Sequence, residues 1–253
     1  MLKNIKAIAF DLDGTIYIGN SLVPGAAELI DYLKNKGVHV FYFTNNSTKT
    51  RNQIFKKLHE FGLFVEINEV YSSAYAAGLY LKENGYNTVY CCGSEGLRTE
   101  IEANGTKCVN DGSKKIKAVV VGLDNSFDYK KMTIGLNLLR NKECKFIVCN
   151  KDRTYPVEGD VLMPGCGPIV ASLENASGRT PDVIIGKPET YMLDLLCRDW
   201  KLKPEQVLVV GDTYDSDIEM AKRAGAKAVF ICKNAEHKDV RTITSIIDIK
   251  EIL

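Results

Sequence analysis

The chain has 253 residues, of which 45% are hydrophobic and 26% are charged, and its formal net charge is +1. This composition is typical of a globular protein, and the nearly balanced charge argues against a nucleic-acid or membrane-surface partner. No apolar run reaches the roughly 18 residues that span a bilayer, so no membrane segment is expected.

The cysteines and histidines argue against a disulfide framework and against a zinc site. The eight cysteines form no C-x-x-C pair and lie mostly in apolar runs, where a reduced Cys behaves as a small hydrophobic residue. We therefore expect a cytoplasmic protein with free thiols rather than a disulfide framework. The histidines, His39, His59 and His237, are scattered, which argues against a zinc site, and we assign them no chemistry.

Short β-type runs alternate with helical patterns along the chain. Residues 6–10 predict a buried strand, Pro24-Gly25 opens a helix that ends at Gly37, and residues 38–43 predict the next strand. A helix is expected after Ser47 and through Leu58. Further strands are expected at 69–71, 89–91, 118–121, 146–148, 183–185, 207–210 and 228–231. Continuous β-branched strands that alternate with helices indicate an α/β fold with a parallel sheet.

Polar clusters follow strands at four places, near residues 11, 44, 187 and 212. Ligands bind beyond the carboxyl ends of the strands in open α/β sheets, so we expect these four places to share one edge of a sheet. The strands between 47 and 187 have no comparable cluster, and that region is expected to form an inserted domain.

The first place is the segment Asp11-Leu12-Asp13-Gly14-Thr15. Two carboxylates this close raise each other's pKa, a cost that a bound cation would remove. Mg²⁺ suits such a site because it takes a few carboxylates together with waters and a phosphate oxygen. Taken alone, the segment is explained equally well as a turn at a strand end.

The second and third places offer groups that suit phosphate. Thr44-Asn45-Asn46-Ser47 precedes an expected helix, whose N-terminus could bind phosphate, although N-capping by Ser47 or Thr48 is an alternative. Lys187 follows another strand, with Pro188 expected in the first turn of a helix. Lys187 could neutralise phosphate charge, although a surface lysine is the commoner reading of such a residue.

The fourth place is the segment from Gly211 to Asp217, which carries three acids within six residues. Asp212 is the first residue after the strand and the best placed metal ligand. Asp217 could orient a metal-bound water from behind the ligands. We assign Asp215 no role in the site.

The order D-x-D-G-T, T-N-N, G-K-P and G-D-x-x-x-x-D resembles the haloacid dehalogenase (HAD) superfamily. Further matches resemble its NagD-type, 4-nitrophenyl phosphatase branch, which carries a large α/β (type II) cap; they lie at Ile16-Tyr17 with Gly19, Cys92–Leu97, Val119–Asp124, Cys149–Thr154 and Pro164–Gly167. The resemblance covers nearly the whole chain. It implies a Rossmann-like, doubly wound parallel core at 1–76 and 181–253, with an inserted α/β cap at 77–180.

The resemblance also implies roles for single residues. Asp11 would be the nucleophile and Asp13 the general acid/base. Mg²⁺ would be held by Asp11, the backbone carbonyl of Asp13, and Asp212. The phosphate-binding residues would be Thr44, Asn45, Asn46 and Lys187. Two departures from many relatives are Thr213-Tyr214 after the metal-binding acid and Lys151 in place of a proline.

The activity implied is that of a phosphoric monoester hydrolase (EC 3.1.3 class) that acts on a small-molecule phosphate ester through an aspartyl-phosphate. A phosphomutase, or a protein that binds a phosphorylated metabolite without turnover, is the alternative. Relatives with this cap often pair through it, so the resemblance implies a homodimer. Within the cap, Asn150, Asp152 and Arg153 could face the substrate, whereas Pro164–Gly167 is better explained as a turn.

Overall fold

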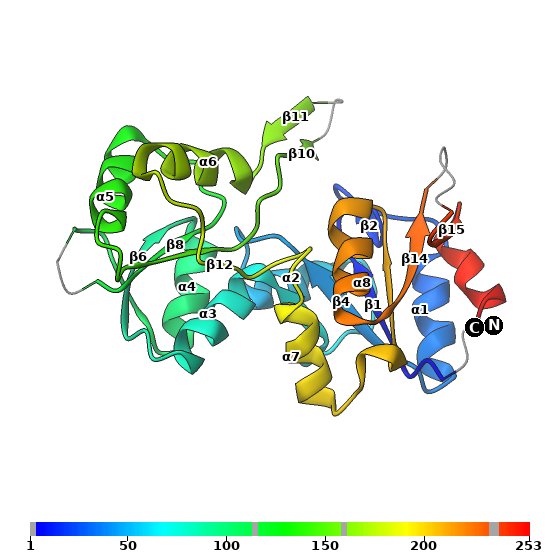
Figure 1. Ribbon diagram of the computed structural model, residues 1–253. Helices are drawn as coiled ribbons and strands as arrows, with labels where there is room; N and C mark the ends of the chain where they lie inside the picture. The colour runs from blue at the N-terminus through cyan, green and yellow to red at the C-terminus, as the bar shows by residue number, and fades with distance from the viewer. Residues whose placement is uncertain (1–3, 113–115, 158–160, 233–237) are drawn as a thin grey trace. The chain divides into compact units, whose positions relative to one another are not determined.

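The computed structural model describes residues 4–112, 116–157, 161–232 and 238–253; His237 lies outside them. Packing divides the chain into two compact units. Figure 1 shows the whole chain, coloured by residue number. Unit 1 comprises Met1–Thr44, Asn52–Tyr71 and Lys187–Leu253, and unit 2 comprises Asn45–Arg51 and Ser72–Gly186. The predicted domain boundaries, at 76/77 and 180/181, stay a prediction.

Unit 1 is built on a six-stranded sheet in the order β15-β14-β13-β1-β4-β5. Its strands are β1 (Ala7–Asp11), β4 (His39–Thr44), β5 (Val70–Ser72), β13 (Val207–Gly211), β14 (Lys227–Ile231) and β15 (Arg241–Ile243). β1 pairs in parallel with both β4 and β13. The strand order therefore runs outward in both directions from this centre, which is the doubly wound arrangement that we predicted.

Helices and short turns connect these strands. The α-helices are α1 (Ala26–Asn35), α2 (Arg51–Glu60), α7 (Tyr191–Trp200) and α8 (Glu219–Ala224). Short 3-10 helices lie at Ile67–Glu69, Pro204–Gln206 and Ile246–Glu251, and a π-helical turn lies at Tyr214–Ile218. A two-stranded antiparallel hairpin, β2 (Tyr17–Ile18) with β3 (Ser21–Leu22), follows β1.

Two expected helix starts are wrong. α2 begins at Arg51 rather than after Ser47, because the Asn46 side-chain oxygen accepts hydrogen bonds from the backbone amides of Thr48 and Lys49 and holds a turn there. Neither Ser47 nor Thr48 is therefore its N-cap. α7 begins at Tyr191, where the first helical bond runs from Asp194 N to Thr190 O, so Pro188 precedes the helix instead of opening it.

Unit 2 is a second α/β layer structure on a five-stranded sheet, in the order β12-β9-β8-β6-β7, whose pairs are all parallel. Its strands are β6 (Thr88–Cys92), β7 (Lys107–Val109), β8 (Ala118–Val121), β9 (Lys145–Val148) and β12 (Val183–Ile184). Its helices are α3 (Ser73–Glu83), α4 (Glu95–Ala103), α5 (Tyr129–Leu139) and α6 (Cys166–Ser177), and an antiparallel hairpin joins β10 (Thr154–Val157) to β11 (Val161–Pro164).

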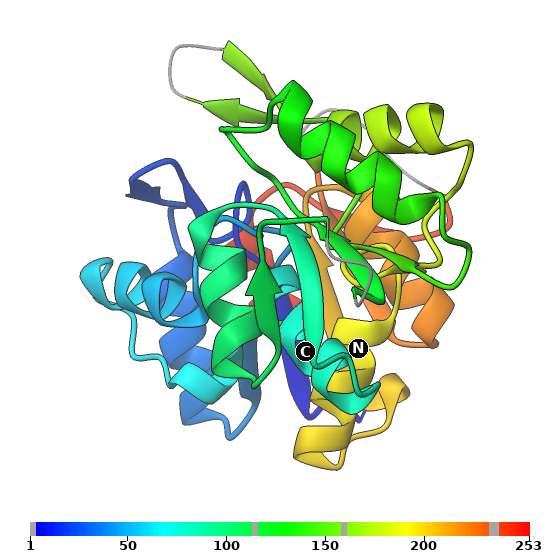
Figure 2. The same cartoon turned by 90° about the vertical axis from the view of Figure 1, so that its left-hand side faces the viewer.

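The helices of unit 2 cover both faces of its sheet. α5 and α6 lie side by side (Figure 2) and share one apolar core with alternate residues of β6, β8 and β9. α3 and α4 pack on each other on the opposite side of the sheet (Figure 1). A parallel sheet covered on both faces explains why its strands are apolar throughout rather than alternating.

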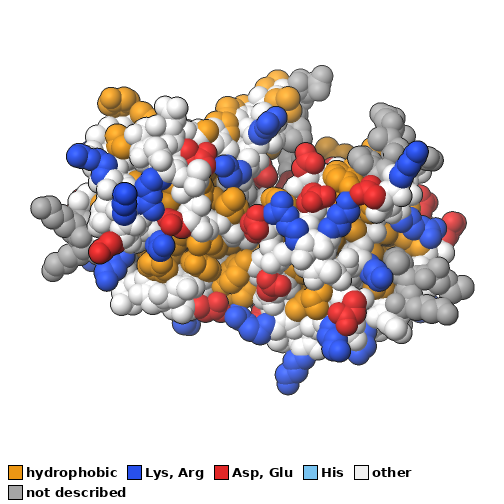
Figure 3. Space-filling model, in the orientation of Figure 1, with side chains coloured by type: hydrophobic (Ala, Val, Ile, Leu, Met, Phe, Trp, Pro, Cys, Tyr) orange, Lys and Arg blue, Asp and Glu red, His pale blue; other side chains and the backbone are white. Residues whose placement is uncertain are grey.

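The distribution of charged side chains and the state of the cysteines match what the composition indicates. Basic and acidic side chains are interspersed over the face drawn in Figure 3 rather than gathered into a single basic area. All eight cysteines are free, and six of them are buried. Among the helices of the described residues, none combines the length and the apolar character needed to cross a membrane.

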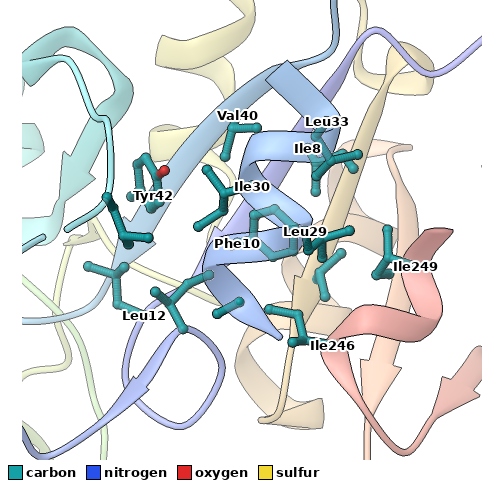
Figure 4. Packing of buried hydrophobic residues seen from close by; sticks show 14 of the residues in the cluster. Ile8, Phe10, Leu12, Leu29, Ile30, Leu33, Val40, Tyr42, Ile246 and Ile249 are labelled. Atoms are coloured by element: carbon teal, nitrogen blue, oxygen red, sulfur yellow. The ribbon is translucent and has the colours of Figure 1, made fainter. Parts of the chain in front are cut away.

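The core beside β1 fixes the position of that strand. Leu29, Ile30 and Leu33 of α1 are fully buried and pack against Ile8 and Phe10 of β1 (Figure 4). Their spacing places them on one face of the helix, as an amphipathic pattern requires. Burial of each such side chain contributes about 1.5–3 kcal/mol, so the strand that ends at the first acidic segment is held firmly.

Candidate active site

The first and last acidic segments meet at the centre of the unit 1 sheet. β1 and β13 are neighbours in parallel register, with Phe10 opposite Val210. Asp11 is the last residue of β1, and Asp212 directly follows the last residue of β13. The two acids therefore stand together where the strand order reverses, the place at which doubly wound sheets bind ligands.

Three carboxylates and one ammonium form the centre of the site. The oxygens of Asp11, Asp212 and Asp217 that could serve as ligands all lie within 4.8 Å of one another. Lys187 Nζ lies 2.5 Å from Asp11 Oδ1 and 2.6 Å from Asp217 Oδ1. Lys187 and Asp217 are buried, with 3% and 1% of their surfaces exposed. The geometry thus brings together four of the residues singled out in the sequence.

The charges of this cluster do not cancel. With every group ionised, three carboxylates face one ammonium, which leaves a formal charge of −2. Burial disfavours the charged form of Lys187, but Asp11 and Asp217 outweigh that effect and raise its pKa. Burial raises the pKa of Asp11 against the opposing effect of Lys187, and burial together with the charge of Asp217 raises the pKa of Asp212 to about 6. A doubly charged cation would relieve both shifts.

The donor set fits a hard divalent cation. Asp212 Oδ1 is buried and has no hydrogen-bond partner among the described residues, although such atoms are normally paired. Carboxylate oxygens are the ligands that Mg²⁺ and similar ions prefer. The side chain of Asp13 is not one of the grouped carboxylates, and its expected contribution to a metal is through its backbone carbonyl.

Gly14 allows the acids to come together. Its φ of +96° is one that residues with a Cβ rarely adopt. A Cβ at Gly14 would also lie only 2.0 Å from Asp212 Oδ2. The glycine of the first segment is therefore required both by the turn and by the close approach of Asp212.

Asp13 lies outside this cluster, near Tyr17 and Lys57. Part of Asp13 is accessible to solvent, yet the protein atoms that crowd its carboxyl remove enough water to raise its pKa, and Lys57 and Lys187 only partly offset this. The Tyr17 hydroxyl lies 3.5 Å from Asp13 Oδ2, and Lys57 Nζ lies 3.8 Å from the centroid of the Tyr17 ring. A raised pKa is what a carboxyl group that exchanges protons near neutrality requires.

Asp217 is held by the π-helical turn that follows β13. Thr213 N donates to Asp217 Oδ2 at 3.1 Å, and Asp217 N donates to Thr213 O at 2.9 Å. This reciprocal pair aims the other carboxylate oxygen at Lys187. Sequence reasoning did not foresee that contact, because no local pattern relates two residues 30 positions apart. Asp215, on the same turn, is exposed and outside the carboxylate cluster.

The expected phosphate-binding segment is divided between the units. Thr44 ends β4 in unit 1 and is buried, whereas Asn45 and Asn46 belong to unit 2. Asn45 Nδ2 donates to both carboxylate oxygens of Asp152, at 3.1 and 3.2 Å. Asn150 Nδ2 donates to the Asn45 carbonyl at 2.7 Å. Two residues expected to face a substrate thus contact Asn45.

Comparison with known proteins places this arrangement in a family. A haloacid dehalogenase-like hydrolase model matches residues 8–107, and a second HAD-hydrolase-like model matches residues 184–245. The acid sugar phosphatase of Staphylococcus haemolyticus is 36% identical over 231 residues, which cover 91% of this chain and 86% of that protein.

Solved structures agree with the sequence matches. The p-nitrophenyl phosphatase from Archaeoglobus fulgidus superposes with a TM-score of 0.91 at 28% identity, covering 99% of this chain and 100% of that one. The glycerol phosphate phosphatase from Mycobacterium tuberculosis, solved in complex with magnesium, gives a TM-score of 0.86 at 25% identity and covers 97% of this chain and 77% of that one. The predicted fold class and resemblance are confirmed. The chain belongs to the haloacid dehalogenase-like hydrolases, in the NagD-type branch that contains the 4-nitrophenyl phosphatases.

Proposed function

We propose that this protein hydrolyses small phosphate monoesters with the help of a bound divalent cation. The observation that carries the proposal is the buried Lys187 ammonium, which contacts Asp11 beside two further carboxylates at the switch point of the sheet. The similar proteins are named for phosphatase activity, which supports the same reaction class. A small phosphate ester is therefore the partner we propose.

Mg²⁺ is the cation that we propose for the site. Asp11 and Asp212 would hold it through carboxylate oxygens, and Asp13 through its backbone carbonyl. Asp217 would orient a water bound to the metal. Bound there, it would offset charge on the transferring phosphoryl group. The unpaired oxygen of Asp212 and the two excess negative charges support a dication, and the magnesium complex of the mycobacterial relative supports this choice.

The side chains of the cluster suit a reaction in two steps. Asp11 attacks phosphorus and forms an aspartyl-phosphate, while Asp13 gives its proton to the leaving oxygen. Asp13 then takes a proton from water, which attacks the aspartyl-phosphate and releases inorganic phosphate. Lys187 neutralises the phosphoryl oxygens throughout. The segment Thr44, Asn45 and Asn46 is proposed to bind the same oxygens.

Unit 2 is proposed as the cap that selects the organic part of the substrate. The named activities of relatives, acid sugar phosphatase and phosphoglycolate phosphatase, favour a small polar ester. A homodimer formed through this cap is proposed on the resemblance alone. The eight free cysteines support a cytoplasmic location.

The decisive experiment replaces Asp11 with Asn and follows phosphate release from 4-nitrophenyl phosphate with Mg²⁺. We expect the rate to fall by about a thousandfold or more, as when other nucleophiles are removed. Removal of the metal with EDTA should stop the wild-type reaction. Asp215→Asn, in the exposed turn beside the site, is the matched control and should keep its rate.

The same assay separates the alternatives. Full activity in Asp11→Asn would overturn the assignment of the nucleophile. Conversion of the ester to an isomer without free phosphate would indicate a phosphomutase, and tight binding without turnover over a panel of esters would indicate a binding protein.

A further inference from the structure

Asn45 contacts four residues of unit 2, through both its backbone and its side chain. Its backbone carbonyl accepts hydrogen bonds from Ser73 Oγ and Asn150 Nδ2, both at 2.7 Å. Its side-chain nitrogen donates to the Asp152 carboxylate. Its side-chain oxygen faces Gly186, where an added Cβ would lie only 2.4 Å away. Both the backbone and the side chain of Asn45 are therefore fixed.

The loop that supplies Asn150 and Asp152 has hydrogen bonds of its own. Asp152 N donates to Asn150 Oδ1 at 3.1 Å, which ties the two partners of Asn45 to each other. Gly167 N donates to Asp152 O at 2.8 Å from the start of α6. Asn150 is buried, with 3% of its surface exposed. Functional side chains need supporting hydrogen bonds of this kind, since they have to be held to within about 0.5 Å of their working geometry.

Asn45 lies at a point where the chain passes from one unit to the other, next to a residue proposed to bind phosphate. The chain passes between the units at 44/45, 51/52, 71/72 and 186/187. Asn45 lies at the first of these passages, its partner Ser73 lies beside the third, and its neighbour Gly186 lies at the fourth. Thr44 precedes Asn45, and Lys187 follows Gly186. The contacts of Asn45 therefore restrain the peptide neighbours of two residues proposed to bind phosphate.

We propose that Asp152 is a positioning residue for phosphate binding, which it supports by holding Asn45 and, through it, the chain at Thr44 and at Lys187. The inference rests on the proposed phosphatase function. A carboxylate is suited to the task because its two oxygens can both accept from one amide group, and a charged acceptor makes a stronger hydrogen bond than a neutral one. Release of Asn45 would let the phosphate-binding groups move out of the positions in which they contact phosphate, which would weaken binding.

The test measures KM and kcat for 4-nitrophenyl phosphate with Mg²⁺. It compares the wild type with the variants Asp152→Ala, Asp152→Asn and Lys151→Ala. Lys151 is the neighbour of Asp152 in the same loop, but its side chain is paired with Glu174 at 2.9 Å, so its removal is the matched control. We expect Asp152→Ala to raise KM, and the inhibition constant of inorganic phosphate, about tenfold while kcat falls less. Asp152→Asn keeps the shape and one acceptor, so its effect should be smaller. Lys151→Ala should change neither constant.

A merely structural role for Asp152 predicts a different result. Loss of folded protein would lower kcat and leave KM unchanged. Unaltered KM and kcat in Asp152→Ala, with the wild type active, would overturn the proposal. In addition, Asn45→Ala combined with Asp152→Ala should be no worse than the more damaging single variant, because the two side chains act as a pair. Fully additive losses would count against the pairing.

Hydrogen–deuterium exchange separates this proposal from the proposed function. Exchange in the peptide 44–51 should rise in Asp152→Ala and stay at the wild-type level in Lys151→Ala. If the wild type hydrolyses no phosphate ester, the proposed function fails while a rise in exchange still supports the restraint of Asn45. Unchanged exchange in Asp152→Ala overturns the restraint whether or not the wild type is active.

Discussion

At the scale of single residues, Lys187 carries the positive charge that offsets the carboxylates of the site. Its ammonium contacts Asp11 and Asp217 in a buried setting. Removing one partner of a buried ion pair leaves unpaired charge and costs about 3–5 kcal/mol. We predict that Lys187→Met lowers the free energy of unfolding by this amount at neutral pH without divalent cations, as measured by urea denaturation. Added Mg²⁺ should restore part of the loss.

The control for this prediction is Lys145→Met. Lys145 pairs with Asp182 at 3.4 Å, but 46% of its side chain is exposed. Such a pair contributes about 0–1 kcal/mol, so its loss should be small. Equal losses in the two variants would contradict the view that Lys187 compensates the buried carboxylates.

The residues of the site differ in how far the sequence could predict them. Asp11 ends β1 and Asp212 follows β13, and the carboxyl ends of such neighbouring parallel strands share an edge, so the proximity of these two acids could be predicted. The expectation that Lys187 follows a strand of the same sheet is wrong, because β12 belongs to the sheet of unit 2, so a shared edge does not explain its contact with Asp11. The pairing of Asn45 with Asp152 could not, because the residues are 107 positions apart and nothing local to either of them indicates the other. Contacts of this kind depend on how whole loops pack.

At the scale of elements, the loop between β8 and α5 contains a buried acid, Asp124, that should make stability depend on pH. Asp124 accepts hydrogen bonds from Ser126 N at 2.9 Å and from Lys131 Nζ at 2.7 Å. Burial alone would raise the pKa of Asp124, but these bonds outweigh it and lower the pKa below its ordinary 3.8. A lowered folded-state pKa stabilises the protein above about pH 4, and that contribution is lost as the pH falls through the folded value.

We therefore predict that Asp124→Asn lowers the free energy of unfolding by about 1.5–3 kcal/mol at pH 7, the range for hydrogen bonds to charged groups. The difference from the wild type should shrink as the pH falls below about 4. Urea denaturation at several pH values measures it. A difference that stays constant down to pH 2 would mean that the charge of Asp124 is not the cause.

The elements themselves were predictable where burial leaves a pattern. The central strands of both sheets are continuous apolar runs, and β8 has the expected bounds. The β10–β11 hairpin was missed because β11 is exposed along its whole length, so no face is selected for apolar residues. β7 and β15, of three residues each, lie at sheet edges and are too short to show a period. The start of α2 was misplaced because the side chain of Asn46 holds a turn there.

At the scale of the whole molecule, binding of the cation should stabilise unit 1. A ligand that binds only the folded state at a hundred times its Kd adds about 2.7 kcal/mol to the free energy of unfolding. For a unit of this size that corresponds to roughly 5–10 °C in Tm. We predict such a shift with Mg²⁺ by calorimetry, in the transition of unit 1, because all three carboxylates lie there.

Asp212→Asn should remove most of this shift, whereas Asp215→Asn should preserve it. Asp215 lies in the same turn but is exposed and outside the carboxylate cluster. An equal shift in both variants would show that the ion binds elsewhere.

The contacts of Asn45 have a consequence for how such a chain can change over evolutionary time. The segment Ser72–Gly186 begins and ends beside this one residue, since Ser73 bonds to its carbonyl and Gly186 lies against its side chain. A long segment whose two ends meet can be replaced as a cassette without new linkers or a change in the sheet that carries the acids. Recombination could thus exchange this segment while the sheet of unit 1 stays unchanged, provided that the incoming segment brings its own partner for the Asn45 amide.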